Sequence, residues 1–147
     1  ERWLQAEQPR LGHCAFASGH LDEIRIMRDA TRDLLAAAAQ GTTPSPAALE
    51  HLNAVSAAAP ISPQLELDGD GELRALEAGT AAEPLAQLRG TLARSAIALL
   101  TGPQRASLRI CPAPSCGMFF LGSRRWCCSA CGNRARAARH YRRTRGR

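Results

Sequence analysis

Residues 111–134 read CPAPSCGMFFLGSRRWCCSACGNR, and this stretch holds five of the six cysteines of the 147-residue chain. Cys111 and Cys116 form one group, and Cys127, Cys128 and Cys131 form a second. Zn²⁺ prefers four soft ligands in a tetrahedron, and two cysteine pairs supply two thiolates each. In a reducing compartment, clustered cysteines favour a metal over disulfide bonds. We therefore predict one structural zinc ion in this segment.

The residues between the two cysteine groups predict how the metal site is built. An apolar run at 118–121 is followed by a glycine turn and by a second short run that ends at Trp126. This pattern predicts a knuckle, a β-hairpin, a second knuckle and then a helix. A segment of this size cannot bury enough apolar surface to fold unaided, whereas zinc contributes on the order of 10 kcal/mol in comparable peptides. The metal is therefore expected to hold the segment in its fold.

The residues alone leave the third zinc ligand open between two neighbouring cysteines. Cys128 and Cys131 have the commoner knuckle spacing, whereas Cys127 directly follows Trp126. His140 is a weaker rival, because it lies among arginines in the predicted last helix.

The chain ends in a basic helix, for which Asn133 is a natural N-cap. Ala135, Ala138 and Tyr141 are predicted to pack on the zinc core, and the opposite face is basic. Guanidinium groups in a row suit phosphates and guanine edges. The predicted nucleic-acid contacts are Arg124, Arg125, Arg134, Arg136, Arg139, His140, Arg142, Arg143 and Arg145.

The charges divide the chain into an acidic part and a basic part. Residues 1–83 hold all thirteen acidic residues and six arginines, a net charge of −7. Residues 84–147 hold thirteen arginines and no acid, a net charge of +13. The alternative is a solvated arginine face without a partner, but such faces usually mix charges of both signs. The asymmetry favours a polyanionic partner.

The first hundred residues predict a mostly helical body. Apolar spacing indicates helices over 22–39 and from Pro46, with Ser45 as N-cap, to about Ala58. Two short runs, 64–68 and 72–76, flank a Gly-Asp-Gly turn and predict a hairpin. A capping box at 80–83 predicts a third helix that ends at Thr101. The fold class is α+β, with a body at 1–103 and a zinc module at 104–147.

At Trp126-Cys127 and Cys131-Gly-Asn-Arg134, and through Tyr141, the chain resembles the CGNR zinc finger family. The resemblance implies a DNA-binding zinc finger of treble-clef type, with Cys111, Cys116, Cys127 and Cys131 as its ligands. The body resembles, more loosely, the ABATE domain that usually precedes this finger and is linked to stress-related transcription regulation. ABATE domains open with a strand bearing an Asp…Asn-Thr signature, which this sequence lacks. The chain is therefore expected to be a fragment without that strand.

These features predict a cytoplasmic bacterial transcription regulator that binds DNA and whose body senses a signal or forms a homodimer. An adaptor that binds RNA or protein through the same module is the alternative. No apolar stretch is long enough to span a membrane. We expect no enzymatic activity, because no carboxylate pair, phosphate loop or nucleophile motif is present. Cys14, beside His13, is the only conceivable nucleophile and is expected to be inert.

Overall fold

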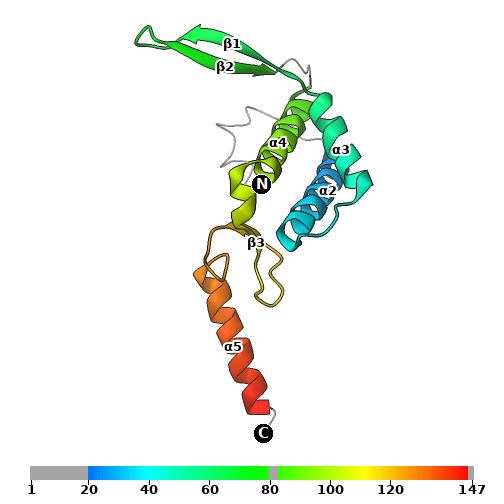
Figure 1. The fold of residues 1–147 in the computed structure, drawn as a ribbon, viewed down its shortest axis with the longest axis vertical. Helices are drawn as coiled ribbons and strands as arrows, with labels where there is room; N and C mark the ends of the chain where they lie inside the picture. Colours follow the sequence, from blue (N-terminus) through cyan, green and yellow to red (C-terminus); the bar gives the residue numbers. More distant parts are fainter. Residues whose placement is uncertain (1–19, 80–82, 146–147) are drawn as a thin grey trace.

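The computed structural model describes residues 20–79 and 83–145 (Figure 1). The expectations about the first strand, Cys14 and the threonine of the capping box lie outside these residues. The described chain forms three helices, a protruding two-stranded hairpin, and a small module that ends in a long helix. The predicted α+β class is confirmed. None of the described helices is both long and apolar enough to cross a bilayer.

The body is a bundle of α2 (His20–Gln40), α3 (Pro46–Ala57) and α4 (Pro84–Thr101). Its core consists of medium-sized apolar side chains on α2 and α3 and of alanines on α4. Ala93 is fully buried, and a Cβ atom at Gly90 would lie 2.5 Å from the Cβ atom of Ala59. The small residues of α4 thus allow the close approach that a core poor in aromatic residues requires. The buried core residues are Met27, Leu34, Ala48, Leu52, Val55, Ala93 and Ala96.

The helix ends agree with the sequence in part. Ser45 caps α3 as predicted, and its Oγ atom accepts a hydrogen bond from the Ala48 backbone N–H. The third helix instead begins at Pro84, after an N-cap residue, Glu83, whose side chain makes no capping bond. Apolar spacing places Leu49 on the expected buried face of α3 and Leu92 on that of α4, but the two side chains are 42% and 38% exposed. α4 buries Leu85 and Leu88 near its start and Ala93 and Ala96 farther along, where alanine permits closer packing against the other helices.

The predicted hairpin is confirmed and is longer than expected. β1 (Ile61–Leu67) pairs antiparallel with β2 (Leu73–Gly79). Asp68 shapes the turn, because its Oδ1 atom accepts hydrogen bonds from the backbone N–H groups of Asp70 and Glu72, both at 3.0 Å. The hairpin extends away from the helices, and most of its side chains are exposed (Figure 1).

The C-terminal module consists of η1 (Pro103–Ser107), β3 (Leu108–Ile110), β4 (Phe119–Leu121) and α5 (Ser129–Arg145). β4 pairs with β3, with Arg109 opposite Phe120, so the predicted partner at 124–126 is wrong. The two strands enclose the first cysteine group rather than connecting the two groups. The predicted N-cap at Asn133 is also wrong, because α5 begins four residues earlier.

Candidate metal centre

Four cysteines bring their sulfur atoms together at the centre of the module. The Sγ atoms of Cys111, Cys116, Cys127 and Cys131 all lie within 4.8 Å of one another. The Sγ atom of Cys127 is 3.7 Å from that of Cys116 and 3.4 Å from that of Cys131. A Zn–S bond of about 2.3 Å in a tetrahedron places neighbouring sulfurs about 3.8 Å apart. The donor set and its spacing fit one zinc ion.

The first two ligands are positioned by the loop between β3 and β4. The Cys111 N–H donates to the Met118 carbonyl at 2.8 Å, and the Cys116 N–H donates to the Ala113 carbonyl at 3.1 Å. Ser115 and Gly117 flank Cys116 with φ values of 56° and 66°, in the left-handed region. A left-handed serine is uncommon, and it occurs here where the chain must reverse tightly around a ligand.

The other two ligands lie at the start of α5. Cys131 is in the first turn of the helix and is 2% exposed. The backbone N–H of Cys127 points to the Sγ atom of Cys111 at 3.5 Å, and Arg134 Nη2 lies 3.3 Å from the Sγ atom of Cys131. Four thiolates around Zn²⁺ leave a net charge of −2, which the N–H group, the guanidinium and the helix N-terminus all stabilise.

The thiol pKa values show how closely these groups interact. Burial tends to raise the pKa of Cys111, but backbone N–H groups, chiefly that of Cys127, outweigh it and lower this pKa to about 6. The pKa of Cys127 is raised, first by the neighbouring Cys131 sulfur and then by burial. Adjacent thiols without a cation cannot all ionise, because the thiolates repel one another. A divalent ion removes that repulsion.

The structure brings Cys127, and not Cys128, into the four-sulfur group. Cys128 is exposed, and its Sγ atom lies 3.9 Å from that of Cys127 on the outside of the cluster. His140 is also exposed, on the part of α5 that extends beyond the module. This arrangement agrees with the ligand set implied by the CGNR resemblance.

A very small apolar core surrounds the sulfurs. Ala113 and Phe120 are buried there, and Trp126 packs against them. A Cβ atom at Gly132 would lie only 3.1 Å from Cδ1 of Trp126. The glycine therefore lets the indole ring lie against the first turn of α5. The prediction that Tyr141 packs on this core is wrong. Tyr141 is 55% exposed, and its ring lies under the guanidinium of Arg145.

The predicted basic contacts fall into two sets. The guanidinium groups of Arg124 and Arg125 lie 5.4 Å from the ring centre of Phe120 and 5.1 Å from that of Trp126. Arg134 is exposed, but its guanidinium also contacts the Cys131 sulfur of the metal site. The remaining predicted residues are exposed along α5 beyond its first turn: Arg136, Arg139, His140, Arg142, Arg143 and Arg145.

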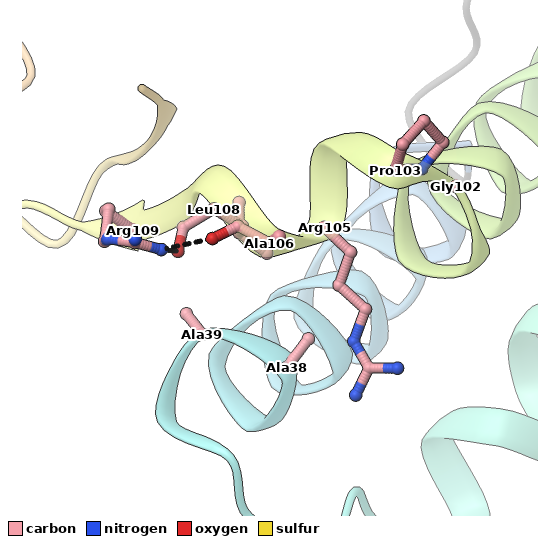
Figure 2. A pocket seen from close by; sticks show the side chains of 8 residues that line it. All are labelled: Ala38, Ala39, Gly102, Pro103, Arg105, Ala106, Leu108 and Arg109. Carbon is pink, nitrogen blue, oxygen red and sulfur yellow. Dashed lines mark hydrogen bonds between the residues drawn. The ribbon is translucent and has the colours of Figure 1, made fainter. Parts of the chain in front are cut away.

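One arginine of the body also reaches the metal module. Arg32, on α2, donates to the Gly117 carbonyl at 3.0 Å, and its guanidinium lies 5.4 Å from the Phe119 ring centre. Sequence reasoning missed this contact because its partners are 85 residues or more apart and nothing local marks them. Near the same junction, a cavity of about 400 Å³ lies between α2 and the segment leading into β3 (Figure 2). Arg105 and Arg109 line it on the module side.

Comparison with protein families identifies both parts of the chain. The ABATE family model, described as "Putative stress-induced transcription regulator", matches residues 1–103. The CGNR zinc finger model matches residues 107–144. No curated protein matches the chain.

Proposed function

This chain belongs to the ABATE family and carries a CGNR zinc finger, and on that premise we propose that it regulates transcription by binding duplex DNA through α5. The observation that carries the proposal is the charge of this helix. Six arginines lie between positions 134 and 145, and no acidic residue occurs after Glu83. Such an uncompensated row of guanidinium groups has a strong affinity for phosphates.

The attachment of α5 supports this role. Only Cys131, Gly132 and Ala135 of the helix are buried, all near its start. The rest of the helix projects from the module, away from the body (Figure 1). The major groove of DNA is about 12 Å wide and admits one α-helix. The segment from Arg134 to Arg145 rises about 17 Å, which is long enough to contact several successive phosphates on each side of the groove.

Four of the six arginines occupy two opposite sides of the helix, whereas Arg139 and Arg142 lie nearer the side of Ala135. At about 100° per residue, Arg134 and Arg145 fall on one side, and Arg136 and Arg143 fall on the other. Between these sides, and opposite the buried Ala135, runs an exposed strip of residues that contains no arginine. In a major groove the two sides face the phosphate walls and the strip faces the base edges. The strip consists of Asn133, Ala137, His140 and Thr144.

The salt dependence of binding tests the proposal. With six arginines near phosphates, the logarithm of the affinity for duplex DNA is expected to fall with the logarithm of salt concentration with a slope of about −5. Replacing Arg136, Arg139 and Arg143 by alanine is expected to reduce that slope by about 3. Arg28→Ala, an exposed arginine on α2, is the matched control and leaves the slope unchanged.

The affinities for structured RNA and for a neutral polymer are measured in parallel. Tighter binding to RNA than to duplex DNA, or no dependence on salt, contradicts the proposal. The first result favours the RNA-binding alternative. The second favours an adaptor that binds protein.

Zinc acts in this proposal as a structural ion. Four protein thiolates fill a tetrahedron and leave no position for a substrate or an activated water, so the site has no catalytic role. Its effect is to order the first turn of α5 and thereby to fix the direction in which the arginines project.

The body provides a surface suited to a homodimer. Residues opposite one another in the β1–β2 register share a face, which places Leu65, Leu67 and Leu73 on the same side. These leucines are 75%, 69% and 68% exposed. Pairing of two copies through this face would bury them, and two copies would present two α5 helices to a repeated DNA site. Sedimentation of the wild type against Leu65→Ser/Leu67→Ser tests this, because a mass unaffected by the substitutions excludes the face as a dimer contact.

A further inference from the structure

A fifth thiol lies next to the metal site but outside its ligand set. Cys128 is exposed and directly precedes Ser129, the first residue of α5. Its Sγ atom lies 3.9 Å from that of Cys127, and the backbone N–H groups of Cys131 and Ala130 point to it. This thiol is therefore open to solvent and close to sulfurs that hold the metal.

Cys128 and Cys131 form a Cys-x-x-Cys sequence at the start of a helix, an arrangement found at reactive cysteines. Cys128 lies one residue before α5 and Cys131 in its first turn, and if Cys128 continued the helix their Cβ atoms would lie about 5–6 Å apart, whereas a disulfide needs about 3.8 Å. A small movement in the first helical turn closes this gap. Adjacent residues are less suitable, because their Cα atoms are about 3.8 Å apart and disulfides need at least about 4.4 Å. Cys131 is thus a better partner for Cys128 than Cys127 is.

We propose that Cys128 is a peroxide-sensitive thiol that forms a disulfide with Cys131 and thereby removes one ligand from the zinc site. The proposal rests on the four-cysteine site and not on DNA binding. It assigns a purpose to an exposed cysteine that the metal does not need. The strongest geometric support is the contrast in exposure, since the thiol that meets the oxidant is on the surface and its partner is 2% exposed.

The chemistry balances with hydrogen peroxide as the oxidant. The Cys128 sulfur attacks one peroxide oxygen, the O–O bond breaks, and Cys128 sulfenic acid and one water form. The Cys131 thiolate then attacks the Cys128 sulfur, the S–O bond breaks, and the departing hydroxide takes a proton from solvent to form a second water. Two sulfurs are oxidised to a disulfide and one peroxide is reduced to two waters. Thiol reductants reverse the reaction.

Loss of Cys131 as a ligand would leave zinc with three thiolates. Because Cys131 also fixes the first turn of α5, the disulfide would release the helix from the metal site. Around the metal site, only the small core of Phe120 and Trp126 then remains. Zinc release is therefore the direct consequence to measure.

The experiment uses the full zinc-loaded chain. Hydrogen peroxide is added, zinc release is followed with a chromogenic chelator, and disulfides are mapped by mass spectrometry after the remaining thiols are blocked. The wild type is expected to release one zinc per chain and to form the Cys128–Cys131 disulfide, and dithiothreitol with added zinc is expected to restore the site. Cys128→Ser is expected to release zinc at least about tenfold more slowly, because its remaining sulfurs in the site are buried or metal-bound.

Cys14→Ser is the control, because Cys14 is the one cysteine in the sequence outside residues 111–131, and the variant is expected to behave as the wild type does. Equal rates of zinc release in the wild type and Cys128→Ser overturn the proposal. So does a disulfide without Cys128, or oxidation that dithiothreitol does not reverse. The zinc content of Cys128→Ser is measured before oxidation, so that a folding defect is not mistaken for slow zinc release. A variant that binds no zinc at this stage would show that Cys128 is itself a ligand, and this result also overturns the proposal.

Discussion

The body and the zinc module of this chain are stabilised by different means. The body buries side chains from three helices, with Leu34, Leu52 and Val55 at the centre of an apolar core. Around its four sulfurs the module buries Ala113, Phe120 and two of its cysteines, with Trp126 partly covered, and outside this cluster it adds only Leu108 and Ala135 as buried apolar side chains. Apolar burial at about 25 cal/mol per Å² can support the first but is too small for the second. The module therefore depends on its ion, and the body does not.

The largest expected effect comes from removing a zinc ligand. Cys131→Ser is expected to abolish stoichiometric zinc binding and to unfold the module, because a structural zinc contributes on the order of 10 kcal/mol to folding. The helical signal of the body is expected to remain. Zinc content by atomic absorption and amide hydrogen exchange, region by region, measure both outcomes.

Comparing serine variants of the two neighbouring cysteines tests which of them is a ligand. Cys127→Ser is expected to lose zinc as Cys131→Ser does, whereas Cys128→Ser is expected to keep one zinc per chain. Metal loss in the Cys128 variant alone would reverse the ligand assignment. Unfolding of the body together with the module would show that the two regions are not independent.

The second largest effect is expected on the stability of the body, without an effect on the zinc module. Leu52→Ala removes a side chain that is 3% exposed at the centre of the helical core, and is expected to lower the free energy of unfolding by about 2–5 kcal/mol. Leu49→Ala, on the same helix but 42% exposed, is the matched control and is expected to change it by less than about 1 kcal/mol. Urea unfolding followed by circular dichroism at 222 nm gives both values.

Measuring the zinc content of the two leucine variants shows whether their effect is confined to the body. Both leucine variants are expected to bind one zinc per chain in the absence of urea. A loss of metal in Leu52→Ala would mean that the core of the body supports the zinc site, contrary to the division drawn between the two regions.

The sequence predicts more of the module's chemistry than of its architecture. Spacing indicates Cys111, Cys116 and Cys131 as ligands, but it leaves the third ligand open between Cys127 and Cys128, and only the CGNR resemblance implies Cys127. The strand partner of Phe119–Leu121 was wrong because pairing depends on distant contacts, and Leu108–Ile110 carries no strong strand signal by itself. The start of α5 was wrong because the metal site requires Cys131 in the first turn, and this outweighs the preference of Asn133 for a capping position.

In the body, periodicity located the helices and the turn residues located the hairpin. Periodicity did not show which of two adjacent faces is buried, because Leu49 and Ala48 both fit an apolar stripe on α3. The choice is made by the alanine-rich surface of α4, where Ala93 is fully buried. Such a preference for close helix approach is a property of the packed pair and is not visible in either helix alone.

The smallest expected effect concerns the contact that joins the two regions. Arg32 donates to the Gly117 carbonyl and lies over Phe119, so it connects α2 with the loop that follows the ligand Cys116. The contact is exposed, and Arg32→Ala is therefore expected to lower the stability of the zinc-loaded protein by only about 1 kcal/mol. Thermal unfolding of the zinc-loaded chain measures this change, with Arg28→Ala on the same helix as the control.

Removing the metal turns this small effect into a test of coupling. Without zinc, the loop that carries Gly117 has little to hold it, so Arg32 loses its partner and Arg32→Ala is expected to have no effect on the body. The difference between the effects with and without zinc is then the coupling free energy between the two regions. An equal loss of stability in both states would show that Arg32 acts within α2 alone, and that the metal module and the body fold without energetic contact through this arginine.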